Sequence, residues 1–431
     1  MKFSIRAKSW IFISMVSVGS VFAQQKPVTD QVAGIPVNYD ESLSGIYTLP
    51  EILTLQNGKK VKDADTWLKK RRPEILSLYE ENQFGKMPGR PADMMFNVFD
   101  KGTSVFNGKA IRKQVTIYLS KDTSKNKMDL LIYLPANSST PVPLLLTANF
   151  SANSNATNDA GVKPSMTWSK DGKRIPAPAG RSFGKLDVEK FVSQGYGLAT
   201  FCYTDIEPDV LDGIRYGIRG QYLKQGASQP APDEWGTIST WAWGISRIID
   251  YMETDKSINA KRIAIEGASR LGKTVLWAGA HDPRIAMVIA SCSGEGGAAL
   301  SRRNYGETIK HLTAPTRYPY QFAANYGKYG DNVNSFPVDG HMLVSLMAPR
   351  PVLLQTGDTD TWSDPKGEFL AAVAAEPVYK LFGKKGPGTD VMPKPGQLDM
   401  LNPLGYYMHA GGHGTIPSDW DIFIDFMKKY L

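Results

Sequence analysis

The chain contains very little cysteine: only Cys202 and Cys292 among 431 residues. An exported protein of this length does not need a disulfide framework. A single bridge between the two is an alternative, but both fall at the ends of predicted strands, and we expect none. Paired C-x-x-C motifs and an H-E-x-x-H motif are absent as well. The sequence therefore predicts no zinc site, no other metal and no cofactor.

Long apolar runs are missing after the first 23 residues. The N-terminus combines a basic start, the short apolar run "IFISMVSVGSVFA" and small residues before Gln24, which is typical of a secretory signal peptide. The run is too short to span a bilayer comfortably, and an uncleaved membrane anchor is the alternative. We expect a signal peptide over residues 1–23 and an exported protein, periplasmic or secreted, with no membrane contact after cleavage.

Clustered charge of one sign is also missing. The formal net charge is +8, but the Lys and Arg residues are scattered along the chain rather than gathered into a stripe. A nucleic-acid partner would call for such a stripe, so we expect none. The excess of positive charge indicates only a mild attraction to acidic substrates.

The hydrophobic pattern changes near residue 140. Three segments before it alternate between polar and apolar residues, as in antiparallel strands at a sheet edge: 93–102, 110–120 and 128–136. Five continuous apolar runs follow, several separated by helical stretches such as 241–252 and 273–280, as in parallel strands buried on both faces: 142–150, 196–205, 261–269, 285–294 and 349–358.

This pattern predicts an α/β-hydrolase fold. We expect a mostly parallel central sheet with antiparallel N-terminal strands and helices on both faces, which makes a three-layer sandwich. Residues 24–431 are expected to form a single catalytic domain with an N-terminal arm, and the protein is expected to be a monomer.

Ser269 lies in "RIAIEGASRLGKTVLW", where an apolar strand turns into a helix. Such a turn exposes a serine hydroxyl and aims the first N–H groups of the helix at developing negative charge. The usual elbow reads G-x-S-x-G, whereas here Leu271 replaces the second glycine and Gly272 comes one residue late. Ser269 is a candidate nucleophile, with a helix N-cap serine as the alternative.

A serine nucleophile needs a base, and the chain has five histidines. In the hydrolase order of nucleophile, acid and histidine, the base follows the last strand of the sheet. His413 lies there between two glycines, on a loop able to project an imidazole. His409 follows an apolar run and is expected to be structural, and His281 is expected to end the helix after Ser269.

The base in turn needs an acid that orients it. Asp360 follows the run 349–358 at a G-x-x-D position where hydrolases often carry this acid; Asp358 is the alternative, and either could instead cap a turn. Arg270 and Lys273 come just after the candidate nucleophile. A guanidinium beside the reacting carbonyl would hold an oxyanion strongly, whereas the alternative for both cations is a solvated charge on a helix.

From about residue 45 to its end, the chain resembles the bacterial glucuronoyl esterases of carbohydrate esterase family 15. Four segments carry the resemblance: "EGASRLGKTVLWAGAHDPRI", "SGEGGAALSRRNYGETI", "DTDTWSDPKGEFLAA" and "GGHGTIPSDW". The most specific piece is S-R-x-G-K, in which Gly272 belongs to the family's own form of the turn. Members of the family cleave the ester between 4-O-methyl-glucuronic acid on xylan and an alcohol of lignin.

The resemblance also implies residue roles around the substrate. Arg270 would assist the oxyanion, and Lys273 is similar to a residue that contacts the sugar hydroxyls. Glu307 and Trp362 resemble a glucuronate-binding pair. An indole face suits a sugar because C–H surfaces pack on the ring. The alternatives are that Trp362 is a core residue and that Glu307 is a charge on a helix face.

By the same resemblance, Ser269 is the nucleophile and His413 the base. Some members, the fungal ones especially, take the acid from a glutamate in an E-S-G-x-G-G segment, where this chain has Cys292. A thiol cannot stabilise an imidazolium as a carboxylate does. Asp360 resembles the second acid position used by bacterial members, and we expect it to be the acid. Glu295 is a further alternative.

The sequence thus favours an exported serine esterase that forms an acyl-enzyme on Ser269 and acts on glucuronoxylan–lignin esters. An acetyl-xylan or other carbohydrate esterase is one alternative. A neutral acyl group would not need Arg270, Lys273 and Glu307 around the site, which argues against it. The other alternative is a catalytically silent carbohydrate-binding relative, which the thiol at Cys292 keeps open.

Overall fold

The structure of the protein is a computed structural model that describes residues 30–169, 171–179 and 184–431. The expected signal peptide, residues 1–23, lies outside the described residues. No helix in the described part of the chain is both long enough and apolar enough to cross a membrane. Cys202 and Cys292 are buried and unbridged, which confirms the expectation that no disulfide joins them.

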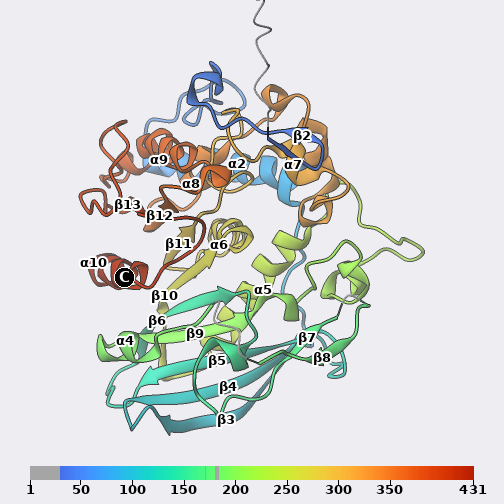
Figure 1. The fold of residues 1–431 in the computed structure, drawn as a ribbon, viewed down its shortest axis with the longest axis vertical. Helices are drawn as coiled ribbons and strands as arrows, with labels where there is room; N and C mark the ends of the chain where they lie inside the picture. The colour runs from blue at the N-terminus through green and yellow to red at the C-terminus, as the bar shows by residue number, and fades with distance from the viewer. Residues whose placement is uncertain (1–29, 170, 180–183) are drawn as a thin grey trace, which may run out of the picture.

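A nine-stranded sheet forms the centre of the molecule (Figure 1). In spatial order its strands are β13 (Leu404–His409), β12 (Val352–Gly357), β11 (Met287–Ser291), β10 (Ile258–Ala268), β6 (Val142–Asn149), β9 (Gly197–Cys202), β5 (Lys127–Pro135), β4 (Ala110–Tyr118) and β3 (Met95–Val105). Neighbours run parallel from β13 to β9 and antiparallel from β9 to β3. The predicted α/β-hydrolase architecture is confirmed.

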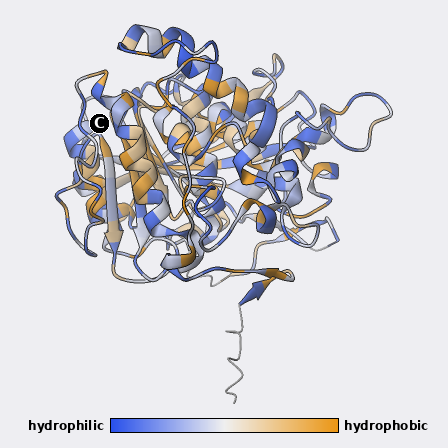
Figure 2. Cartoon of the chain, turned by 90° about the horizontal axis from the view of Figure 1, so that it is seen from above, coloured by the Kyte–Doolittle hydropathy of each residue, from blue (hydrophilic) through white to orange (hydrophobic). Residues whose placement is uncertain are grey.

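Helices cover both faces of the sheet, and each face has its own apolar core. The larger core contains Leu144 and Leu146 of β6 together with Trp277, and the smaller one contains Leu145 and Phe423. Successive strand residues point to opposite faces, so a strand covered on both sides must be apolar at every position. Figure 2 shows the apolar residues concentrated on the central strands and the helix sides that face them.

The larger core is covered by α2 (Arg72–Tyr79), α5 (Thr237–Met252), α6 (Arg270–His281), α8 (Gly340–Ser345) and α9 (Pro365–Lys380), and the smaller one by α4 (Val188–Ser193) and α10 (Asp419–Tyr430). Short elements decorate this frame: α1 (Ala64–Thr66), α3 (Asn153–Ala156), α7 (Ile309–Thr313), and the hairpins β1–β2 (Gln31–Val32, Ile35–Pro36) and β7–β8 (Met166–Trp168, Arg174–Pro176). The end of α6 at His281 confirms the expected helix boundary.

The turn from β10 into α6 explains the displaced glycine of the sequence motif. A Cβ at Gly267 would lie 2.6 Å from the carbonyl oxygen of Leu271, and one at Gly272 would lie 2.9 Å from that of Ser291. Leu271 itself is completely buried and packs in the larger core. Of positions 271 and 272, the one that leaves no room for a side chain is therefore Gly272, where α6 packs against the end of β11.

Replacing Gly272 by alanine should lower the free energy of unfolding by about 1–3 kcal/mol, because the added methyl group forces α6 away from β11. Urea unfolding of the purified variant measures this. Gly89→Ala is the control, since a Cβ there meets nothing within 4 Å. Equal midpoints for Gly272→Ala and the unmodified protein would contradict the close-approach argument.

Candidate active site

Ser269 occupies the tip of the β10–α6 turn in a strained conformation. Its φ is 59° and its ψ −126°, a region that side-chain-bearing residues rarely adopt and that is typical of a nucleophile elbow. Although Ser269 is the N-cap residue of α6, its side chain makes no capping hydrogen bond, so the structure does not support the N-cap alternative. Its backbone N–H donates to the carbonyl of Ser291, 2.8 Å away, at the end of the next strand.

His413 and Asp360 meet at the same edge of the sheet. Asp360 follows β12, and His413 lies on the loop after β13, with its Nδ1 2.7 Å from the Asp360 carboxylate. The Asp360 side chain is 5% exposed and that of His413 43%. Burial alone would raise the pKa of the Asp360 carboxyl, but the hydrogen bond and charge of His413 outweigh it and lower that pKa. The ring is thus held through Nδ1 while Nε2 is left open.

The loop of His413 reaches the end of β11, the strand next to the one that leads into Ser269. Cys292 follows Ser291, and its Sγ accepts a hydrogen bond from the backbone N–H of Gly414 at 3.3 Å. Among the described residues, neither the Ser269 hydroxyl nor His413 Nε2 makes a hydrogen bond. Catalytic hydrogen bonds are often long in unliganded enzymes and shorten when substrate binds.

The alternative acids lie elsewhere. Asp358 is exposed and accepts a hydrogen bond from the N–H of Gly411 at 2.8 Å, so it supports the loop but not the imidazole. Glu295 is buried against Ser301 and Tyr326, and burial raises the pKa of its carboxyl to about 8. Of the three candidates, Asp360 is the one that contacts His413.

Arg270 is fixed rather than solvated. Its guanidinium forms an ion pair with Asp209 and lies 4.7 Å from the ring centroid of Tyr318. Asp209 also accepts hydrogen bonds from the hydroxyl of Tyr320 (2.9 Å) and the amide of Gln321 (2.8 Å). Asp209 could not be predicted from the sequence, because no local motif marks it and it lies 61 residues before its partner.

Lys273 is 5% exposed, one helical turn after Ser269. Its ammonium makes no hydrogen bond or close ion pair among the described residues, although the charge of Glu307 acts on it. Burial lowers the pKa of Lys273, and the nearby charge of Glu307 opposes that shift. A buried ammonium with free donors is costly without partners. It is therefore well suited to bind oxygen atoms of a ligand.

Glu307 and Trp362 lie side by side, since the Glu307 N–H donates to the carbonyl of Trp362 at 2.9 Å. Arg317, which the sequence analysis missed, joins them: its guanidinium is 2.8 Å from the Glu307 carboxylate and 5.2 Å from the Trp362 ring. Trp362 remains partly exposed, so it is neither a core residue nor fully solvated. Burial raises the pKa of Glu307, while Lys273 and Arg317 oppose that shift.

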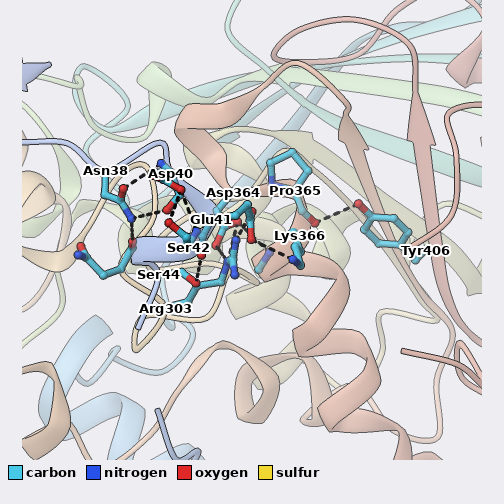
Figure 3. A network of polar contacts seen from close by, with 12 residues as sticks. Asn38, Asp40, Glu41, Ser42, Ser44, Arg303, Asp364, Pro365, Lys366 and Tyr406 are labelled. Carbon is cyan, nitrogen blue, oxygen red and sulfur yellow. Dashed lines mark hydrogen bonds and ion pairs between the residues drawn. The ribbon is translucent and has the colours of Figure 1, made fainter. Parts of the chain in front are cut away.

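An N-terminal arm, residues 35–44, braces these loops from outside. The carbonyl of Asn38 accepts from the N–H of Gly306 at 2.8 Å, next to Glu307. Arg303, whose side chain is 3% exposed, bridges Glu41 of the arm and Asp364, two residues after Trp362 (Figure 3). The arm therefore fixes both loops that carry the Glu307–Trp362 pair.

Known proteins that are similar to this chain are esterases. The family model of the fungal glucuronyl esterases matches residues 172–383. A carbohydrate esterase from an unknown prokaryotic organism is 38% identical over 98% of each chain. The solved glucuronoyl esterase from Solibacter usitatus is 44% identical, with a TM-score of 0.85 over 90% of this chain and 99% of its own. The 4-O-methyl-glucuronoyl methylesterase of Schizophyllum commune is 27% identical over 78% of this chain and 74% of its own.

Arg303 and Lys366 both contact Glu41 of the N-terminal arm, but only Arg303 is buried. Replacing Arg303 should therefore destabilise the folded protein far more than replacing Lys366. Arg303→Met leaves Asp364 buried and unpaired, and we expect a loss of about 3–5 kcal/mol in the free energy of unfolding. Lys366, whose side chain is 46% exposed, is the other partner of Glu41. Lys366→Met should lower the free energy of unfolding by at most about 1 kcal/mol. Urea denaturation at neutral pH measures the stability of both variants. Similar losses would show that Arg303 does not hold the N-terminal arm against the loop of Asp364.

Proposed function

The chain belongs to the glucuronoyl esterases of carbohydrate esterase family 15, and we propose that it hydrolyses the ester between 4-O-methyl-glucuronic acid of glucuronoxylan and an alcohol of lignin. The observation that carries the mechanism is the 2.7 Å contact between His413 Nδ1 and the buried Asp360. It orients the imidazole and leaves Nε2 available as a base, on the sheet edge that also carries Ser269.

In the proposed reaction, His413 Nε2 takes the proton of the Ser269 hydroxyl as the serine oxygen attacks the ester carbonyl. The tetrahedral intermediate collapses to an acyl-enzyme on Ser269, and the imidazolium returns its proton to the departing alcohol. A water molecule, deprotonated by the same nitrogen, then releases the glucuronic acid and regenerates the serine. Asp360 holds the tautomer and stabilises the imidazolium throughout.

Arg270 is the proposed oxyanion-stabilising side chain. Its pairing with Asp209 and its position over Tyr318 hold the guanidinium in one place before substrate arrives. Preorganised donors stabilise developing charge without reorganising during the reaction. The first N–H groups of α6 add partial positive charge at the same point.

Lys273, Glu307 and Trp362 are the proposed sugar-binding residues. The Lys273 ammonium has free donors and the Glu307 carboxylate accepts, so together they suit the donor and acceptor character of sugar hydroxyls. The partly exposed indole of Trp362 offers an apolar face for the sugar ring. Arg317 contacts Glu307 and Trp362 and so holds the two side chains in position.

We further propose that residues 1–23 direct export and that residues 24–431 act as one monomeric catalytic domain with an N-terminal arm. The basic and apolar character of the first segment supports export. The attachment of the arm to the loop of Glu307 supports its inclusion in the catalytic unit.

The role of the acid is tested by substitution. Asp360→Asn should lower kcat about 10⁴-fold, because the amide no longer stabilises the imidazolium and favours the wrong tautomer. Cys292→Ala should lower it by less than about tenfold, since a thiol does not serve that role. Steady-state hydrolysis of benzyl glucuronate measures both; equal or reversed effects would refute the assignment of Asp360.

The substrate class is tested at Lys273. Lys273→Met should lower kcat/KM for benzyl glucuronate about 10- to 100-fold, the value of a charge-assisted hydrogen bond of about 1.5–3 kcal/mol. Lys428→Met, exposed on α10, is the matched control. Faster hydrolysis of acetylated xylan, unaffected by Lys273→Met, would favour an acetyl esterase. Binding of the glucuronate ester with no turnover would favour a silent carbohydrate-binding relative.

A further inference from the structure

Cys292 is a residue that the esterase mechanism does not use, yet it is buried beside the catalytic pair. It lies just after β11, is completely buried, and has a φ of 44°. Its Sγ, a ring nitrogen of His413 and a carboxylate oxygen of Asp360 all lie within 4.8 Å of one another, and the Nδ1 of His413 is the nitrogen 2.7 Å from Asp360. The three ligand atoms come from three separate segments that converge at the same edge of the sheet.

Thiolate, imidazole and carboxylate are the ligands that Zn²⁺ and the softer Cd²⁺ prefer. A tetrahedral Zn²⁺ site separates its ligand atoms by about 3.5 Å, given bond lengths of about 2.0–2.3 Å. The present cluster needs only small adjustments, which the loop of His413 can make because it is exposed and flanked by Gly412 and Gly414.

Two groups beside the cluster, the N–H of Gly414 and the hydroxyl of Ser363, would support a bound cation. The N–H of Gly414 already donates to the sulfur of Cys292, and such a bond also stabilises a thiolate. The hydroxyl of Ser363, 3.1 Å from His413 Nδ1, or a water molecule can fill the fourth position.

We propose that Cys292, Asp360 and His413 bind a thiophilic divalent cation and that this binding inhibits the enzyme; the inhibition rests on the proposed esterase function, whereas the binding does not. The cation takes the lone pair of His413 Nδ1, so the proton that Nδ1 shared with Asp360 moves to Nε2. In that tautomer Nε2 cannot accept the proton of Ser269. The thiol of Cys292 gives its proton to solvent as the cation binds.

Titration of the full-length enzyme with Cd²⁺ tests the binding directly, through the thiolate-to-metal charge-transfer absorption in the ultraviolet. The same samples are assayed for benzyl glucuronate hydrolysis, with each variant scored against its own metal-free rate. We expect the unmodified enzyme and Cys202→Ala to bind and to be inhibited reversibly, with EDTA restoring the rate. Mg²⁺ should have no effect, because it prefers oxygen ligands.

Cys292→Ala and Cys292→Ser should both bind Cd²⁺ at least about 100-fold more weakly and lose the inhibition, since even an outer contact to a metal site is worth about 10- to 100-fold. The serine variant guards against a folding defect of the alanine variant. Unchanged binding in both, or loss of binding in Cys202→Ala, would overturn the proposal. A charge-transfer band without any esterase activity in the metal-free enzyme would retain the metal site and refute the proposed function instead.

Discussion

The parallel pairing of β10, β11, β12 and β13 is the constraint on which the site depends. Parallel neighbours end at the same edge of a sheet, so residues that follow successive strands are brought together however far apart they lie in the chain. Ser269 follows β10, Cys292 follows β11, Asp360 follows β12 and His413 follows β13. A slip in register of any one strand would remove its residue from the cluster.

The same constraint allows an orienting acid to come from the end of either of two adjacent strands. Cys292 follows one of them and Asp360 the other, and both lie within 4.8 Å of a ring nitrogen of His413. A carboxylate at either strand end can therefore orient the same imidazole. The small, buried thiol of Cys292 contacts the backbone of the His413 loop.

Three arginine side chains around the sheet edge are paired with carboxylates, whereas Lys273 has no close ion pair among the described residues. Arg270 pairs with Asp209, Arg317 with Glu307 and Arg303 with Asp364. Removing a charge from water is costly unless a partner offsets it, so these pairs keep their side chains in place. Lys273 is buried without such a partner in the described part of the chain, so a bound ligand would stabilise its ammonium.

The sequence by itself determined the fold class, because continuous apolar runs at strand length can be buried only in a parallel sheet covered on both faces. It also indicated Ser269, Asp360 and His413, since each lies at or shortly after the end of a predicted strand or an apolar run. The partners Asp209 and Arg317 and the bracing arm were decided only by the tertiary structure. Their contacts join residues far apart in the chain. The choice between Asp358 and Asp360 was also left open, because both lie in the same turn after one apolar run. What distinguishes the two is burial and direction, which exist only once the strands have assembled.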